Sequence, residues 1–130
     1  MRAVSLLAPT AFCVLFAGFQ AVPASQGQRT CTITAAVTPS NAMADHSAVP
    51  PGNQVQFSLV STVNGTCPLV ADQFGSWSTS GTVNTAISTS AQNVTQAVAM
   101  CLNTTANPVT ITYSGTVRGH SYSPAALSCK

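Results

Sequence analysis

Apolar and polar residues alternate one by one in short runs along most of the chain, and turn-forming residues separate these runs. The clearest run covers residues 54–60, where Val55, Phe57 and Leu59 alternate with polar side chains. This period of two is typical of a β-strand with one buried face, because successive side chains of a strand point to opposite sides. After residue 24 no stretch has the longer period of an amphipathic helix, so the sequence predicts an all-β fold.

Seven strands are expected from this pattern and from the turn residues between the runs. They cover residues 31–38, 54–60, 76–80, 85–88, 94–102, 109–117 and 122–129. Residues 61–76, rich in Gly, Pro and polar residues, are expected to form a loop that Cys67 ties down. In the fifth run the inner face is ambiguous, since two sets compete for it: Val94, Val98 and Met100, or Ala97, Ala99 and Cys101. Short strands in this number, with Trp77 on the third, predict an immunoglobulin-like β-sandwich of two antiparallel sheets, although other small β folds fit the same pattern.

The N-terminus has the pattern of a secretory signal peptide. A positive start at Arg2 precedes an apolar stretch over residues 4–19, and Val22 and Ala24 fit cleavage before Ser25. An uncleaved membrane anchor is the alternative, but this stretch is shorter than the roughly 20 residues that span a bilayer. We therefore expect a signal peptide over residues 1–24 and one secreted or periplasmic domain over residues 25–130, with no membrane span.

Four cysteines remain after removal of the signal peptide: Cys31, Cys67, Cys101 and Cys129. An even number in a chain bound for an oxidising compartment predicts two disulfides. A four-thiolate zinc site would need close Cys-x-x-Cys pairs, which these spacings lack. A catalytic thiol would need an unpaired cysteine with a histidine partner. Spacing alone leaves three pairings open.

Four segments resemble the bacterial Ig-like domains of group 2, which occur in surface and secreted proteins. They are Val37-Thr38-Pro39-Ser40, Val49-Pro50-Pro51-Gly52-Asn53-Gln54-Val55-Gln56-Phe57, Trp77-Ser78-Thr79-Ser80 and Val109-Thr110-Ile111-Thr112-Tyr113. The chain departs from the family pattern at Gly81, where Asp is common, and at Gln92-Asn93, where Gly is usual. The resemblance implies a stalk, spacer or adhesion module.

Such a sandwich also implies which cysteines pair. Its first strand starts at the same end as the loop between the second and third strands, which brings Cys31 near Cys67. Its fifth and last strands both finish at the opposite end, which brings Cys101 near Cys129. The resemblance therefore favours these two disulfides over the other pairings.

Charged residues make up only 5% of the chain, and its formal net charge is +2. This leaves no basic stripe for nucleic acid and no acidic cluster for calcium. General acid and base groups in the mature chain are limited to Asp45, His46, Asp72 and His120. A hydrolytic set of a serine, a histidine and Asp72 lacks the Gly-x-Ser-x-Gly elbow that would support it. We expect no enzymatic activity, no cofactor and no metal site.

Two binding modes are predicted instead. Edge strands without Lys or Glu pair readily with a strand of another chain, so the first expectation is a protein or cell-surface partner bound by strand addition. Prolines, glycines and short strands could equally protect these edges. The second expectation is a carbohydrate or other small ligand stacked on the loop aromatics Phe74 and Tyr122, because Phe57, Trp77 and Tyr113 are assigned to the core.

Overall fold

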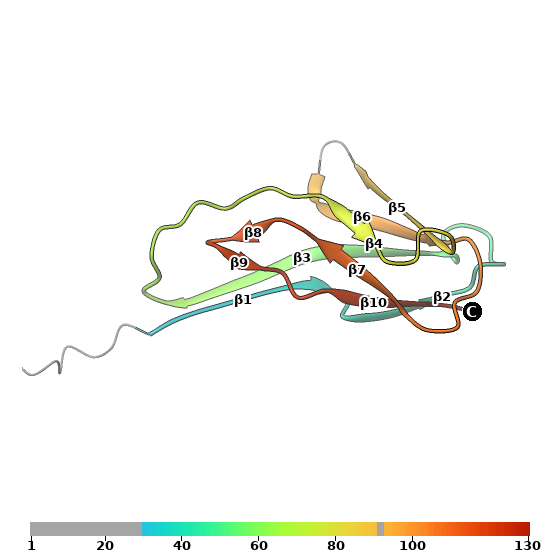
Figure 1. Cartoon of the computed structure of the whole chain (residues 1–130), viewed down its shortest axis with the longest axis horizontal. Coiled ribbons are helices and arrows are strands. Elements are labelled where there is room, and N and C mark those ends of the chain that lie inside the picture. Colours follow the sequence, from blue (N-terminus) through green and yellow to red (C-terminus); the bar gives the residue numbers. More distant parts are fainter. Residues whose placement is uncertain (1–29, 91–92) are drawn as a thin grey trace, which may run out of the picture.

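A computed structural model describes residues 30–90 and 93–130 of the chain. These residues form strands and no helix (Figure 1). The strands are β1 (Cys31–Thr38), β2 (Asn41–Ala44), β3 (Gln54–Gly65), β4 (Trp77–Thr79), β5 (Thr85–Ser90), β6 (Asn93–Cys101), β7 (Val109–Tyr113), β8 (Thr116–Val117), β9 (His120–Ser121) and β10 (Ala125–Cys129). The predicted signal peptide, residues 1–24, lies outside the described residues. The prediction of an all-β fold is confirmed.

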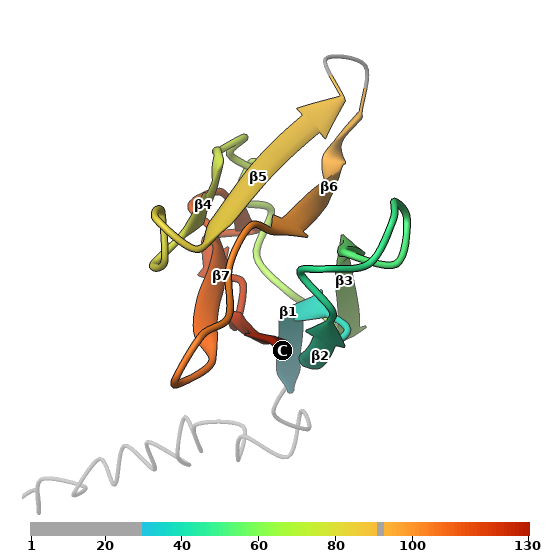
Figure 2. The same ribbon diagram turned by 90° about the vertical axis from the view of Figure 1, so that its right-hand side faces the viewer.

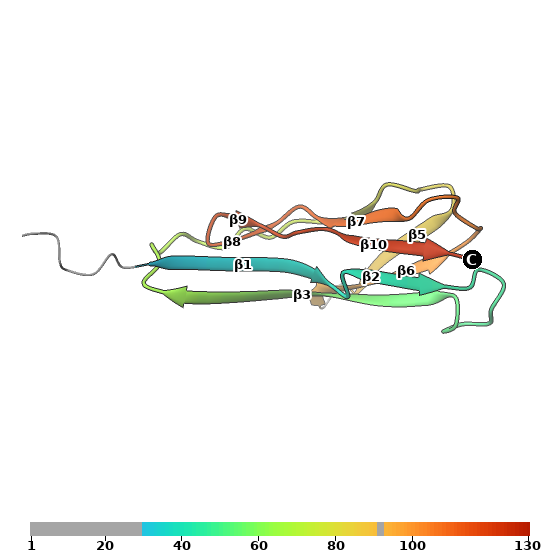
Figure 3. The ribbon, with the colours of Figure 1, turned by 90° about the horizontal axis from the view of Figure 1, so that it is seen from below.

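Eight strands form two four-stranded sheets, with the orders β1-β3-β6-β5 and β2-β10-β7-β4. The strands β8 and β9 form a separate hairpin, whose turn residues Arg118 and Gly119 have φ angles of 47° and 80°. Pairing between these strands is antiparallel except between β2 and β10, which run parallel. An isolated bridge between Ala36 on β1 and Ser123 is also parallel. The two sheets lie face to face, with β7 and β10 in one layer and β1 and β3 in the other (Figure 3).

One core fills the space between the sheets and draws side chains from both. The side chains of Phe57 on β3, Ile111 on β7 and Leu127 on β10 have no exposed surface. Trp77 is buried on β4, and its ring centroid lies 5.3 Å from that of Tyr113 on β7. The assignment of Phe57, Trp77 and Tyr113 to the core is therefore confirmed.

The structure resolves the ambiguous inner face of β6. Ala97, Ala99 and Cys101 are buried, whereas Val94 is 39% exposed. The reason is the partner strand: Phe57 pairs with Ala97 in the register of β3 with β6. A small residue opposite the large buried ring leaves room for it between the sheets.

The two disulfides follow the pairing that the resemblance implied. Cys31 bonds to Cys67, and this bridge joins the start of β1 to the segment after β3. Cys101 bonds to Cys129, and both residues are buried. Because β6 and β10 belong to different sheets, the second bridge links the two layers covalently. Both bonds indicate an oxidising environment.

The number and bounds of several strands differ from the prediction of seven strands in two sheets. Ten strands in three sheets are present in the described residues. The predicted loop at 61–76 begins later, since β3 continues to Gly65 and pairs with all of β1. The run 109–117 is divided into β7 and β8, and the run 122–129 begins only at Ala125. The short strand β2 has no counterpart in the prediction, because its pairing with β10 joins residues far apart in sequence.

Candidate functional site

The predicted ligand platform, Phe74 and Tyr122, lies at one small cavity of about 110 Å³. Phe74, in the segment between β3 and β4, is 82% exposed, and Tyr122, between β9 and β10, is half-buried. Asp72 also lines this cavity. The structure thus brings together two aromatic residues that lie 48 positions apart in the sequence.

The backbone on both sides of Phe74 is held in place. Gln73 and Thr116 exchange two backbone hydrogen bonds of 2.9 Å, and the Gly75 N–H donates to the Tyr113 hydroxyl at 2.9 Å. A Cβ atom at Gly75 would lie only 2.0 Å from the backbone nitrogen of Gly115, so a glycine is needed for this close approach. The exposed Phe74 ring is therefore carried by an ordered backbone and not by a free loop.

Tyr122 is anchored by aromatic packing, since its ring meets that of Tyr113 edge-on at 5.5 Å. Burial raises the pKa of the Tyr122 hydroxyl, and the negative charge of Asp72 acts in the same direction. A side-chain hydrogen bond with Ser61 acts in the opposite direction, so the Tyr122 hydroxyl already has a partner within the protein.

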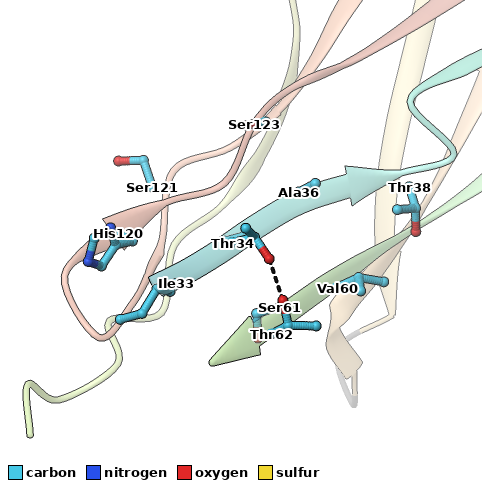
Figure 4. A pocket seen from close by; sticks show the side chains of 11 residues that line it. Ile33, Thr34, Ala36, Thr38, Val60, Ser61, Thr62, His120, Ser121 and Ser123 are labelled. Carbon is cyan, nitrogen blue, oxygen red and sulfur yellow. Dashed lines mark hydrogen bonds between the residues drawn. The ribbon is translucent and has the colours of Figure 1, made fainter. Parts of the chain in front are cut away.

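A larger groove of about 390 Å³ runs between β1, β3 and the β8–β9 hairpin (Figure 4). Its lining is rich in hydroxyl groups, and two of them, on Thr34 and Thr62, are hydrogen-bonded to each other. The only titratable side chain in the lining is His120, which is exposed. This groove has no counterpart in the sequence pattern, because it depends on how far β9 stands from β1.

The groove closes where β1 meets the segment before β10. There the Val37 N–H donates to the Ser123 carbonyl at 2.8 Å, and the Ser123 N–H donates to the Ala35 carbonyl at 2.9 Å. The outer side of β1 is therefore partly occupied by backbone of the same chain.

The titratable residues do not gather into a reaction centre in the described residues. The Ser47 hydroxyl and backbone N–H donate to the Asp45 carboxylate, and these bonds hold its pKa below the usual value. The Nδ1 atom of His46 lies 2.8 Å from the backbone oxygen of Lys130. Asp72 accepts a hydrogen bond from the backbone N–H of Arg118. These contacts stabilise turns and strand ends.

Residues 30–90 and 93–130 contain no group of three or more His, Cys, Asp or Glu side chains that could hold a metal ion. The same residues include no helix of the length and apolar character that crossing a membrane requires.

The four strands at the edges of the two large sheets are β1, β5, β2 and β4. Their sequences, CTITAAVT, TAISTS, NAMA and WST, contain no Asp, Glu, Lys or Arg. The expectation of uncharged edge strands is confirmed. The edges differ in accessibility: β2 and β4 are only 4 and 3 residues long, β1 is partly covered, and β5 runs along the outside of its sheet beside β6 (Figure 2).

Comparison with known proteins finds no family model, no curated protein and no solved structure that matches this chain.

Proposed function

We propose that this protein is an exported, non-catalytic module with an immunoglobulin-like β-sandwich fold, which binds a polypeptide partner through a sheet edge. The strand order supports the fold. With β1 and β2 as the two halves of a first strand, the sheets correspond to the A-B-E-D and A′-G-F-C orders of such sandwiches. The strands β8 and β9 then extend the hairpin between the last two strands, which reduces ten strands to seven.

Export is supported by the two disulfides and by the predicted signal peptide at residues 1–24. The bridge between Cys101 and Cys129 joins the sheets, as the inter-sheet disulfide of many such domains does, although it connects different strands. The buried Trp77 on the third strand of the proposed order is a second shared feature.

Uncharged edge strands are the observation that carries the binding function. Natural β-proteins commonly protect open edges with charged side chains, because unpaired N–H and C=O groups invite another strand. None of the four edges has such protection here, and β5 is long enough to pair. The module therefore suits adhesion or assembly, in which main-chain hydrogen bonds supply affinity.

The test uses residues 25–130 with both disulfides formed and immobilised through Lys130, against a displayed library of random peptides. We expect enrichment of peptides that compete with one another for the protein. Absence of enrichment above background, with the disulfides shown intact by mass spectrometry, would refute the proposal. Export is tested separately by the mass of the mature chain, which should begin at Ser25 and lack four hydrogens.

A second candidate function is carbohydrate binding on Phe74 and Tyr122. The observation that favours it is the 82% exposure of Phe74 on a backbone held on both sides, because exposed aromatic rings stack on sugar faces. A glycan array should then show retention that Phe74→Ala abolishes. Leu69→Ala is the matched control, since Leu69 lies in the same segment and is 93% exposed. Retention of no glycan by the folded wild type would exclude this function.

A further inference from the structure

We infer that the open side of β5 and the cavity beside it form a binding site for an extended, uncharged peptide strand that inserts one aliphatic side chain between the two sheets. This inference rests on the proposed function and specifies its surface and its ligand. It is carried by three features: the direction of the β5 backbone groups, a cavity at the same edge, and the absence of charge.

The first feature follows from the register of β5 with β6. The Leu102 N–H donates to the Asn84 carbonyl at 2.8 Å, and the Cys101 N–H points away from β5 and donates to the Asn53 carbonyl at 2.9 Å. The pair of Asn84 and Leu102 is therefore a hydrogen-bonding position of the ladder, and the pair of Thr85 and Cys101 is not. In antiparallel pairing such pairs alternate, and every second residue directs its N–H and C=O away from the partner strand. With Thr85 opposite Cys101, the residues of β5 that face outward are Thr85, Ile87 and Thr89.

One of these outward N–H groups is already used, because Thr85 donates to the Gly81 carbonyl at 2.8 Å. Ile87 and Thr89 remain, and in the described part of the chain no strand pairs with their side of β5. The regular ladder ends at Thr89, where the register shifts. The open edge therefore offers the backbone groups of two residues to an incoming strand.

The second feature is a cavity of about 170 Å³ lined by Gly75, Ser76, Trp77, Ile87, Thr89 and Val94. It opens between the edge of β5 and the segment that leads into β4. Trp77 is buried and Ser76 and Thr89 are exposed, which places the indole at the base and the hydroxyl groups near the mouth.

The polar atom at the base of this cavity already has a hydrogen-bond partner within the protein. The indole N–H of Trp77 already donates to the Val94 carbonyl at 2.9 Å, so its ring can present an apolar surface. Because an apolar cavity of about 150 Å³ accommodates a benzene molecule, this one has room for a Val, Ile or Leu side chain.

Strand geometry allows one ligand to pair with the open backbone of β5 and to occupy the cavity at the same time. An added strand lies about 4.8 Å from β5, and its alternate side chains point to the face on which Ile87 and Thr89 lie. That face is the inner face, where Ile87 packs against the core. A side chain of the added strand at this level therefore points between the sheets, into the cavity.

The same geometry favours a foreign peptide over a second copy of this chain. In a β5–β5 pair, the inner side chain offered by the second copy would be its own Ile87, which is already packed against its own core. Such a pair would leave the cavity empty. None of the residues that line the cavity is charged, so the fitting segment is itself uncharged.

The test uses blocked heptapeptides of threonine with Val, Ile or Leu at the central position, and a matched peptide with Ala there. We expect at least one aliphatic peptide to bind roughly tenfold or more tightly than the Ala peptide, because it buries additional methyl groups. At saturation, hydrogen exchange of the Ile87 and Thr89 amides should slow, while that of other exposed amides stays unchanged.

Two variants separate the backbone from the cavity. Thr89→Pro removes an outward N–H without breaking a bond to β6, and Val94→Phe enlarges a residue of the cavity lining that is 39% exposed. Each should weaken peptide binding roughly tenfold or more. The matched control is Val60→Phe, a 48% exposed site on β3 at the other groove, which should bind like the wild type. Thermal unfolding checks that each variant is folded.

Several results would overturn the inference. If library peptides bind but protect amides elsewhere, or are indifferent to Val94→Phe, this surface is wrong and the proposed function stands. If library peptides bind but none of the threonine-based ones does, the stated ligand chemistry is wrong. If no peptide of any kind binds, the proposed function fails with it. Concentration-dependent protection of Ile87 and Thr89 without peptide would make a second copy the occupant.

Discussion

Removal of each disulfide in turn should reveal that the buried inter-sheet bridge stabilises the fold more than the peripheral one. Chain entropy alone predicts near equality: sequence separations of 36 and 28 residues correspond to about 3.8 kcal/mol for Cys31–Cys67 and about 3.6 kcal/mol for Cys101–Cys129. The structure breaks this equality, because Cys101 and Cys129 are 1% and 3% exposed. Each truncation to Ala leaves a cavity in the core that costs about 1 kcal/mol more.

The double variant C101A/C129A should therefore lose about 5–6 kcal/mol of unfolding free energy, a large part of the 5–15 kcal/mol of a typical domain. The variant C31A/C67A should lose at most about 3.8 kcal/mol, since Cys31 is exposed at the end of an edge strand. Guanidinium chloride unfolding of both variants and the wild type, with comparison of midpoints and slopes, measures the difference. An equal or larger loss in C31A/C67A would refute the reasoning that burial decides the order.

Three further predictions follow from the packing and the charges. Leu127→Ala should lower the free energy of unfolding by about 2–5 kcal/mol, measured by chemical denaturation, because Leu127 is fully buried. Leu69→Ala is the control and should change it by less than about 0.5 kcal/mol, since Leu69 is 93% exposed. Similar losses in the two variants would contradict the assigned core. Gly75→Ala should lower the free energy of unfolding by about 1–3 kcal/mol or more and alter the contacts of Phe74, because the Cβ of the alanine would clash with the backbone of Gly115. An unchanged thermal midpoint would contradict the close approach of Gly75 to Gly115. Hydrogen bonds from Ser47 lower the pKa of Asp45 in the folded protein, so the ionised carboxylate stabilises the fold at pH values above its unfolded pKa of 3.8, and this stabilisation is lost as the pH falls through the folded pKa. Asp45→Asn should therefore flatten the acid side of the curve of unfolding free energy against pH. An unchanged acid slope would contradict this prediction.

Local patterns predicted the parts of the fold that depend on neighbouring residues. The run at 31–38 coincides with β1, and the face with Ala35 and Val37 is the buried one. The turn residues at 81–84 and 103–108 separate strands as expected. These features follow from the alternation of side chains along one strand and from the conformational preferences of turn residues, so no knowledge of a partner strand is needed.

Features that depend on distant partners escaped the pattern. The continuation of β3 to Gly65 arises because β1 offers partners along its whole length, and this pairing overrides the turn character of Asn64-Gly65. The sequence left the inner face of β6 ambiguous, and the pairing of Phe57 on β3 with Ala97 determines it. In both cases the deciding contacts lie more than 25 residues away in sequence.

The candidate sites also combine features that local sequence patterns predict with features that depend on distant segments. Phe74 is exposed, as its loop position suggested, and the low charge of the edges could be read directly from the composition. The stacking of the two sheets decides which edge is open. It also decides that a cavity with Trp77 at its base lies beside Ile87 and Thr89.

The sequence by itself determined the all-β class, the uncharged edges and the four cysteines available for two bridges, because composition and side-chain alternation are local properties. Only the tertiary structure decided the parallel pairing of β2 with β10, the placement of Phe74 and Tyr122 at one cavity, and the position of β5 at the edge of its sheet. These features require segments far apart in the chain to be brought together. Sheet packing does this through burial of a shared core, and a one-dimensional pattern does not specify which segments will meet.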